Sequence, residues 1–587
     1  MTNAQVKARE AIIIANKRGD LLLAYDMCQK VMSSSDDPFY PYQAVLALAR
    51  CGSIERALEA FVDWQLDKEV DEDTLALKAR LLKDQALNLG DLGKLKQAAE
   101  CYLSAFNRTK GYFPAINAAT LFLLSGENSQ AEELALLALE LATEKSEKQS
   151  YYALVTQAEA LLVLNRSNEA KILLPAAVEA CSDDIVSMAR SRMQLSLICE
   201  HHGIPVSILD ELINKKVFHY CGHILNEHQQ SDEQVIARQI SAVFDQHKTL
   251  IGYGSLAAGS DILFAEELIR RGGTLNVFLP FNSDEFKRVS VIPAGGDWEQ
   301  RFDNCIARAA TVSQVTYSNY NNDDSLFAYC TSIAMGQALI CARQLQLPIM
   351  QLAVWDGKKN AGVAGTYSDI ISWQTLGHDF VHIPFDRKKK CNKAPENKTD
   401  RTVSQERELC ALLFCDIRGF SKLTDDDIPW YNDTVLPALA DVISRYKDEI
   451  LFQNTWGDAI YLVSKSATAA ANVCFEIHQV LSQIDQNGIN IPMPLALRAG
   501  LHYGPVYRTF DPILNKDNFF GVEVNRTARI EPVTPPGESF ATEAFSSILA
   551  LENTQSFEFD YAGEIPAAKE FGTFRMFKVR KATTKPV

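Results

Sequence analysis

The sequence predicts a multidomain protein with three folds in succession: an all-α helical-repeat region, an α/β parallel-sheet region and an α+β region. Three observations predict this order. Residues 1–205 are rich in Ala, Leu and Glu, with apolar side chains three and four positions apart, which indicates helices. In residues 215–385, short β-rich runs alternate with helical stretches. Residues 409–582 combine an apolar strand-like run, a hairpin pattern and helical segments.

The amino-acid composition indicates the broad class of protein. The chain has 587 residues, which suggests several domains, and 47% apolar residues, which is ordinary for a globular protein. Its net charge of −16 disfavours nonspecific nucleic-acid binding. The 13 cysteines form no CxxC pair, no secretory segment is apparent, and no uninterrupted apolar run reaches the ~18 residues of a membrane span. We therefore expect a cytoplasmic protein with reduced thiols, no membrane span and no nucleic-acid partner.

A glycine or asparagine followed five positions later by an alanine recurs through the helical region. The pairs are Gly19 with Ala24, Gly52 with Ala57, Gly93 with Ala98, Gly126 with Ala131 and Asn165 with Ala170. Gly and Asn end helices in the left-handed conformation. We expect each small alanine to let the next helix pack closely against its neighbour. The pattern therefore predicts five copies of a helical repeat.

These copies follow one another at intervals near the tetratricopeptide period of about 34 residues. In the third copy, Tyr102, Ala105, Phe106 and Pro114 fall near tetratricopeptide positions. The region resembles a TPR-like helical solenoid with loose repeat lengths. Such arrays offer a concave surface for a protein partner or a small ligand. The alternative is a packed helical domain without a ligand.

The middle region is predicted to form a parallel sheet. The predicted strands are VFHY (217–220), TLIGYGS (249–255), TLNVFLPF (274–281), SQVTYS (313–318) and PIMQLAVW (348–355). Strands that alternate with helices imply parallel strands with crossover helices. Ligands of such sheets bind at the carboxyl ends of the strands.

Two glycine-rich loops are expected at those ends. The candidate ligand contacts are Gly252, Gly254, Ser255, Gly259, Ser260 and Asp261 in the first loop, and Gly362, Gly365, Thr366 and Asp369 in the second. Glycines let backbone N–H groups approach phosphate, and helix N-termini favour anions. The region resembles the SLOG group of Rossmann-like domains, which implies a nucleotide-derived ligand. The alternatives are that the glycines only form turns and caps, or that the region is a hydrolase, for which no acid/base pair stands out.

Residues 386–408 are charged, contain proline and are poor in apolar side chains, which predicts a linker. Beyond it, LCALLFCDI (409–417) reads as a strand that carries Asp416 at its end. EILFQNTWGDAIYLVS (449–464) reads as a hairpin, because Gly457 and Asp458 form a favoured two-residue turn. Two neighbouring carboxylates and a backbone carbonyl suit magnesium or manganese.

Four segments of residues 409–582 carry a resemblance to one family. They are FCDIRGFSKL, NTWGDAIYLV, LRAGLHYGPVY (497–507) and NFFGVEVNRTARIE (518–531). Their order and spacing resemble those of the class III nucleotidyl (adenylate/guanylate) cyclases. The resemblance implies an α+β catalytic domain with a mostly antiparallel sheet.

The resemblance also implies a role for each matched residue. Asp416, Asp458 and the carbonyl of Ile417 match the site for two Mg²⁺ or Mn²⁺ ions. Asn525 matches the asparagine that orients the ribose, and Arg529 matches the arginine that stabilises charge on the α-phosphate. Lys569 matches the lysine on the triphosphate, although the glycine that follows it in the family is Glu570 here.

In this family, the metal pair and the Asn/Arg pair of one site come from different catalytic domains. A homodimer with two equivalent sites is therefore expected. At the two positions that read the base, adenylate cyclases usually carry Lys and Asp, and guanylate cyclases carry Glu and Cys. This chain has Asn454 and Asn518. An amide both donates and accepts hydrogen bonds, so ATP, a pyrimidine nucleotide and GTP all stay open.

The most favoured interpretation is a regulated adenylate cyclase, which makes 3′,5′-cyclic AMP and pyrophosphate from ATP under the control of its N-terminal domains. One alternative is a pyrimidine nucleotide cyclase of the kind used in antiviral signalling. A second is a scaffold in which a degenerate cyclase domain only dimerises. The retained set of Asp416, Asp458, Asn525 and Arg529 argues against that second alternative.

Overall fold

The computed structural model describes residues 3–69, 71–144, 150–181, 184–212, 216–247, 249–359, 362–385, 407–484, 495–553 and 555–582. Contacts within the chain divide it into two compact units. The first contains Met1–Lys216 and Cys341–Pro348, and the second contains Val217–Ile340 and Ile349–Ala582. Residues 386–406 of the predicted linker lie outside the described residues. The three predicted domain boundaries remain predictions.

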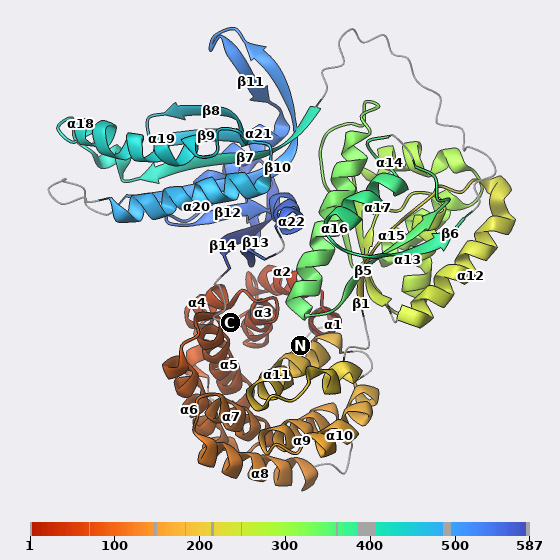
Figure 1. The fold of residues 1–587 in the computed structure, drawn as a ribbon, viewed down its shortest axis with the longest axis vertical. Helices are drawn as coiled ribbons and strands as arrows, with labels where there is room; N and C mark the ends of the chain where they lie inside the picture. Colours follow the sequence, from red (N-terminus) through yellow and green to blue (C-terminus); the bar gives the residue numbers. More distant parts are fainter. Residues whose placement is uncertain are drawn as a thin grey trace. The chain divides into compact units, whose positions relative to one another are not determined.

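The first unit consists of antiparallel helices that pack in sequence (Figure 1). They are α1 (Asn3–Arg18), α2 (Leu21–Met32), α3 (Phe39–Arg50), α4 (Ile54–Asp63), α5 (Glu72–Leu89), α6 (Leu92–Thr109), α7 (Tyr112–Leu124), α8 (Asn128–Glu144), α9 (Tyr151–Val163), α10 (Ser167–Ala180) and α11 (Ile185–His202). Helices α6, α8 and α10 form the outer row, while α5, α7 and α9 line the inside, where α11 lies (Figure 1). This arrangement confirms the TPR-like fold.

The glycine–alanine pattern marks the repeat with one exception. The five alanines are at most 1% exposed, since each lies where two helices cross. Gly19, Gly52, Gly126 and Asn165 have positive φ angles and end their helices. The third copy needs a correction: Gly90, with φ of 64°, ends α5, whereas Gly93 lies in the first turn of α6. The chain reverses three residues earlier there than the pattern predicts.

The parallel sheet of the second unit has six strands in the order β4-β3-β2-β1-β5-β6. They are β1 (Lys216–Gly222), β2 (Thr249–Gly254), β3 (Thr274–Leu279), β4 (Thr311–Gln314), β5 (Ile349–Trp355) and β6 (Phe380–Pro384). The connecting helices include α12 (Gln230–His247), α13 (Ser260–Arg270), α14 (Ser283–Ser290), α15 (Trp298–Arg308), α16 (Ser325–Leu345) and α17 (Thr366–Thr375). The strand order reverses between β1 and β5, where such sheets usually bind ligands.

Two strand predictions in this sheet are corrected. The strand expected over residues 313–318 ends at Gln314, because the Thr316 hydroxyl donates to the carbonyl of Pro280 at 3.1 Å and so turns the chain into a loop. Strand β6 is absent from the predicted set. Its five residues, FVHIP, carry too short a pattern to stand out.

Helix α16 is the one described helix whose length and composition would allow it to cross a membrane, with a mean hydropathy of 1.4 over its best window. This helix contains no uninterrupted apolar run of that length, because polar residues such as Gln337 interrupt the apolar ones. About 72% of that window is buried within the structure. Burial of this kind is also what the core helix of a folded domain shows.

The second sheet follows the order β13-β14-β12-β10-β7-β9-β8, and β11 pairs with β10. Its strands are β7 (Arg407–Arg418), β8 (Ile450–Trp456), β9 (Ala459–Ser464), β10 (Ala496–Asp511), β11 (Lys516–Phe520), β12 (Ser539–Thr542), β13 (Phe557–Pro566) and β14 (Thr573–Lys581). Its main helices are α19 (Leu436–Ser444), α20 (Ala467–Gln483), α21 (Val522–Ile530) and α22 (Glu543–Glu552). Only the pairing of β10 with β12 is parallel among the described pairs, which confirms the mostly antiparallel α+β fold.

Candidate active site

Asp416 lies near the end of β7, which runs between β9 and β10 in the middle of the sheet. The apolar residues before it, such as Leu412 and Leu413, are fully buried and hold the strand in place. In the antiparallel pairing of β7 with β10, Asp416 stands opposite Arg498. The carboxylate is therefore carried by a rigid element rather than by a loop.

Asp458 lies in the two-residue turn between β8 and β9, as the sequence predicts. Gly457 precedes it with a φ of 70°, a conformation that glycine adopts without strain. The pKa of Asp458 rises to about 6, first because the carboxyl is partly buried, and then because it hydrogen-bonds to Asp416 and feels its charge. The structure thus brings the two predicted carboxyl groups into direct contact.

Arg498 and Glu531 complete this cluster, and sequence reasoning assigns no role to either. The Nη2 atom of Arg498 lies 2.8 Å from Oδ2 of Asp416, and its Nε atom forms an ion pair with Glu531. Arg498 stands in the quoted LRAGLHYGPVY segment as a cation between two buried apolar residues. That placement is the signal that could have singled it out.

The donor set fits a hard metal ion with few protein ligands. The two carboxylates of Asp416 and Asp458 lie together, and Arg498 offsets part of their charge. The side chain of Ile417 is buried, so only its backbone carbonyl could contribute. Among the described residues, no group of three or more His, Cys, Asp or Glu side chains could hold a metal ion. Magnesium commonly takes one or two carboxylates and completes its shell with water and phosphate oxygens.

Asn525 and Arg529 lie one turn apart on α21, so they share a face of that helix. Asn525 is exposed and Arg529 is half-buried. Neither side chain makes a hydrogen bond or an ion pair with Asp416 or Asp458 in the described part of the chain.

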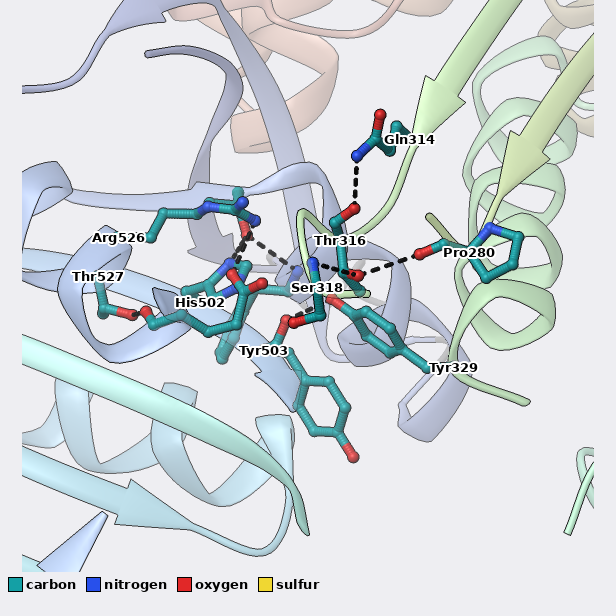
Figure 2. A network of polar contacts seen from close by, with 12 residues as sticks. Pro280, Gln314, Thr316, Ser318, Tyr329, His502, Tyr503, Arg526 and Thr527 are labelled. Atoms are coloured by element: carbon teal, nitrogen blue, oxygen red, sulfur yellow. Dashed lines mark hydrogen bonds and ion pairs between the residues drawn. The ribbon is translucent and has the colours of Figure 1, made fainter. Parts of the chain in front are cut away.

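The opposite face of α21 is held by a buried charge network (Figure 2). Oε2 of Glu523 lies 2.9 Å from Nε2 of His502 and 2.8 Å from Nη1 of Arg526. Burial alone would raise the pKa of Glu523, but the contacts with His502 and Arg526 outweigh it and lower that pKa. Burial lowers the pKa of His502. These charges balance one another, which indicates a structural role.

The middle sheet contacts this network through the loop after β4 and through α16 (Figure 2). The Arg526 guanidinium lies 5.2 Å from the ring centre of Tyr317 and 4.8 Å from that of Phe574. The Tyr329 hydroxyl donates to the carbonyl of Tyr503 at 2.6 Å. Helix α21 therefore packs against residues of both sheets of the second unit.

Asn454 and Asn518, the predicted base-reading residues, lie on strands β8 and β11. These strands are close together, because Nζ of Lys516 donates to the carbonyl of Gln453 at 3.2 Å. The amide of Asn518 already donates to Asp511 and accepts from the N–H of Phe519. The Asn454 side chain, in contrast, makes no hydrogen bond among the described residues. Asn454 is thus the freer of the two amides.

Lys569 lies exposed in the turn between β13 and β14. It has a φ of 58°, and Glu570 has a φ of 55°. Both are left-handed conformations that glycine adopts more easily, which explains why glycine suits the position of Glu570. Nothing in the described structure joins Lys569 to the carboxylate cluster of the same chain.

The glycine-rich loops of the middle sheet are only partly as predicted. Gly252 and Gly254 belong to β2, and a Cβ atom there would lie 2.7 Å from Leu268 and 2.6 Å from Tyr220, respectively. Both glycines allow close packing in the core, and their role as ligand contacts stays a prediction. Gly259 precedes α13 with a φ of 100°, and its Cβ would meet the backbone of Leu225 at 2.4 Å.

The remaining candidates lie at the carboxyl edge of the sheet. Gly362 and Gly365 lie between β5 and α17, Thr366 begins α17, and Ser255 follows β2 directly. Burial raises the pKa of Asp261 to about 7. The pKa of Asp369 rises to about 8, first through burial and then through the charge of Asp261. The structure thus brings two carboxyl groups together where the sequence shows no acid/base pair.

Two protein families match parts of the chain. Residues 402–578 match the family described as "Adenylate and Guanylate cyclase catalytic domain". Residues 20–122 match the family described as "Tetratricopeptide Repeats-Sensor". The first match confirms the class III cyclase resemblance, and the second confirms the tetratricopeptide resemblance. Neither match covers the middle sheet, so the SLOG resemblance stays a prediction.

Individual proteins resemble the C-terminal part. An adenylate cyclase of Mycosarcoma maydis is 28% identical over 167 residues, which cover 25% of this chain and 6% of that protein. The guanylate cyclase domain of RhGC from Catenaria anguillulae in complex with GTP is 18% identical, covers 30% of this chain and 98% of that one, and gives a TM-score of 0.26. The adenylyl cyclase CyaB from P. aeruginosa is 19% identical, with 30% and 96% covered and a TM-score of 0.27. Adenylate and guanylate cyclases both occur among these relatives.

Proposed function

We propose that this chain, which carries a class III adenylate/guanylate cyclase catalytic domain, converts ATP into 3′,5′-cyclic AMP and pyrophosphate. One observation carries the proposal. Two carboxyl groups, Asp416 and Asp458, hydrogen-bond to each other at the end of a buried strand, and Arg498 lies beside Asp416. A pair of acids in contact is costly unless a cation joins it, and a metal-bound triphosphate supplies such cations.

The carboxylates of Asp416 and Asp458 and the carbonyl of Ile417 would hold two Mg²⁺ or Mn²⁺ ions. When bound, these ions acidify the ribose 3′-hydroxyl and offset the charge of the leaving pyrophosphate. In the reaction, the 3′-oxygen bonds to the α-phosphorus, the bond to the β-phosphate oxygen breaks, and the hydroxyl proton is released.

The other proposed residues bind and orient the substrate. The Asn525 amide hydrogen-bonds the ribose and so aims the 3′-oxygen at the α-phosphorus. The Arg529 guanidinium donates to the α-phosphate oxygens, where negative charge develops. Lys569 contacts the triphosphate. Arg498 holds Asp416 in place through its hydrogen bond, and Glu531 fixes Arg498 in turn.

A second copy of the chain would complete each site. Within the described part of one chain, Asn525 and Arg529 make no hydrogen bond or ion pair with the metal carboxylates, which is compatible with a site shared between two catalytic domains. Exposed apolar side chains around these elements support such a contact. They are Trp456, Phe510, Ile513, Phe520 and Val522, which are 45–92% exposed. We infer a homodimer with two equivalent sites.

ATP is the proposed substrate because the Asn454 amide, which is free of other hydrogen bonds among the described residues, matches the donor and acceptor pattern of adenine. An amide also matches a pyrimidine, so a cytidine or uridine triphosphate is the second candidate. Asn518 would have to leave Asp511 before it could read any base. The helical repeat and the middle sheet are proposed to regulate turnover by binding a partner or a small ligand.

The test uses purified full-length protein with Mn²⁺ and each of ATP, GTP, CTP and UTP, with products identified by mass spectrometry. We expect cyclic AMP from ATP, and no product from the Asp458→Asn variant. A different cyclic nucleotide would keep the reaction class and replace the substrate. If no nucleotide yields a cyclic product under any condition, the scaffold alternative takes the place of the enzyme.

A further inference from the structure

The helical repeat holds four cations on its inner helices. Arg50 ends α3, Arg80 and Lys83 lie three residues apart on one face of α5, and Arg190 lies on α11. All four residues are partly buried; the side chain of Arg80 is 19% exposed and that of Lys83 is 13% exposed. We call these four residues the inner cation cluster. It is distant in the sequence from every residue of the catalytic domain.

Direct contacts bring the members of the cluster together. Nζ of Lys83 donates to Oε1 of Gln194 at 2.9 Å, which joins α5 to α11 across 111 positions of sequence. Nη2 of Arg190 donates to the carbonyl of Arg50, which joins α11 to the end of α3. The charge of Arg80 lowers the pKa of both Arg50 and Arg190, so Arg80 lies near both.

Two carboxylates, Asp84 and Asp184, offset part of the charge of these four cations, Asp184 through its effect on Arg50. Asp84 lies 3.5 Å from Arg80 and 3.6 Å from Lys83, and it is the carboxylate in ion-pair contact with the cluster among the described residues. Glu159 is buried, accepts hydrogen bonds from Thr120 and Gln194, and has a raised pKa. The Nε atoms of Arg50 and Arg190 are buried and have no hydrogen-bond partner.

Arginine cannot relieve this imbalance by losing its proton. Burial and the neighbouring arginines lower the pKa of Arg190 only to about 10, so it stays charged at neutral pH. The paired carboxyls of the middle sheet differ, because they take up protons near neutral pH. A buried cation without a partner is costly. An anion from outside the chain would therefore bind this cluster favourably.

A cavity adjoins the cluster at Tyr42. It has a volume of about 200 Å³ and is lined by Pro38, Phe39, Tyr42, Leu66, Glu69, Asp71, Asp73 and Thr74. The pKa of Tyr42 responds to charges on both sides: Asp73 and Asp71 in the cavity raise it, and Arg50 and Arg80 in the cluster lower it. The cavity walls thus combine aromatic rings with carboxylate acceptors, and the charges of Arg50 and Arg80 act on Tyr42 in this wall.

We propose that the inside of the helical repeat binds a small phosphorylated molecule. Its phosphate would accept hydrogen bonds from Arg50, Arg80 and Arg190, whose guanidinium groups match phosphate oxygens in pairs. Its uncharged part would lie in the Tyr42 cavity, where hydroxyl or amino groups can donate to Asp71 and Asp73. This site is separate from the proposed catalytic site and does not depend on it.

The first experiment measures the thermal stability of the full-length chain in EDTA with inorganic phosphate, against sodium chloride of equal ionic strength. We expect phosphate to raise the Tm in proportion to the logarithm of its concentration, as a ligand of the folded state does. Arg80→Gln should abolish this rise. Arg108→Gln, which neutralises an exposed arginine at the end of α6, should keep it.

Two further variants make the test decisive. Arg190→Gln should weaken phosphate binding roughly tenfold or more, as loss of a charged hydrogen bond does. Arg529→Gln, in the catalytic domain, should leave the phosphate effect intact.

A second probe, AMP without metal, tests the cavity by calorimetry. We expect it to bind more tightly than phosphate, and to lose that advantage in the Tyr42→Ala variant. The proposal fails if phosphate stabilises the chain no more than chloride does. It also fails if the effect survives Arg80→Gln, or if Arg529→Gln removes it instead.

Discussion

The catalytic domain and the helical repeat both hold charges that do not balance, but of opposite sign. In the catalytic domain, Asp416 and Asp458 share a hydrogen bond beside Arg498. In the repeat, Arg80 and Lys83 of the inner cation cluster form ion pairs with Asp84. An excess of buried charge costs folding energy that a ligand of opposite charge can recover. The sign of the excess thus indicates a cation for one region and an anion for the other.

The network beneath α21 shows what a balanced cluster looks like. Glu523 contacts both His502 and Arg526, so its charge is offset within the chain. It is also more deeply buried than the two unbalanced clusters, with Glu523 at 1% exposure. Balance and depth go together here, because a deeply buried charge must be satisfied by the chain itself. The two unbalanced clusters keep access to solvent, as binding sites require.

The largest effect is expected at the carboxylate pair. Asp416→Asn or Asp458→Asn keeps the shape of the side chain but removes the charge that would hold metal ions. Turnover measured with Mn²⁺ should fall by about a thousandfold or more. The exposed Asp433→Asn is the matched control and should keep full activity. Activity above a tenth of the wild-type level in either variant would contradict the two-metal assignment.

The next test asks whether each active site is formed by one chain or shared between two. Asp458→Asn and Asn525→Ala are each expected to be inactive, because each spoils both sites of a homodimer. Mixed in equal amounts, they should recover about a quarter of wild-type activity, since half of the dimers are mixed and each of these has one intact site. Measured heterodimers without activity would contradict the shared site.

Removing one charge from the balanced network beneath α21 should destabilise the fold. Glu523→Gln leaves Arg526 and His502 without their anion, and should lower the free energy of unfolding by about 3–5 kcal/mol in urea titrations. Adding Arg526→Met should restore part of that loss. The exposed Glu570→Gln serves as the control. A loss below about 1 kcal/mol would mean that the network does not hold α21.

The smallest effect concerns the carboxyl pair of the middle sheet. The folded-state pKa of Asp369 is raised to about 8, so the folded chain holds a proton that the unfolded chain releases near pH 4. Its contribution to stability is therefore full at acidic pH and is lost as the pH rises toward about 8. Between pH 6 and 9, roughly, the Tm of wild type should fall more than that of Asp369→Asn. The exposed Asp379→Asn should parallel the wild type, whereas parallel curves for Asp369→Asn would contradict the pairing.

Local patterns predicted most of the elements that position the candidate site. The turn at Gly457, the strand that ends near Asp416 and the helix that carries Asn525 and Arg529 all follow from short-range rules. The helical repeat could likewise be read from alanines that pack where helices cross. These features depend on neighbours within a few residues, which a single sequence displays.

Long-range pairing could not be read in the same way. Arg498 meets Asp416 only because β10 lies beside β7, 82 positions away in the sequence. The close packing of Leu268 and Phe218 against Gly252 could not be read from its own stretch of sequence either. Asn518 looks like a free amide until its hydrogen bond to Asp511 is known. In each case a residue distant in the chain decides the role.

The sequence by itself determined the three fold types, the order of the elements and the residues of the cyclase motifs, because periodicity and motif spacing are local. Only the tertiary structure decided which charges meet. It placed Asp416 where its charge acts on Asp458, Asp261 where its charge acts on Asp369, and Arg80 where its charge acts on Arg50 and Arg190. The groups come from different elements in every case. Electrostatic energy depends on distance in space rather than along the chain, so charge balance appears only once the chain is folded.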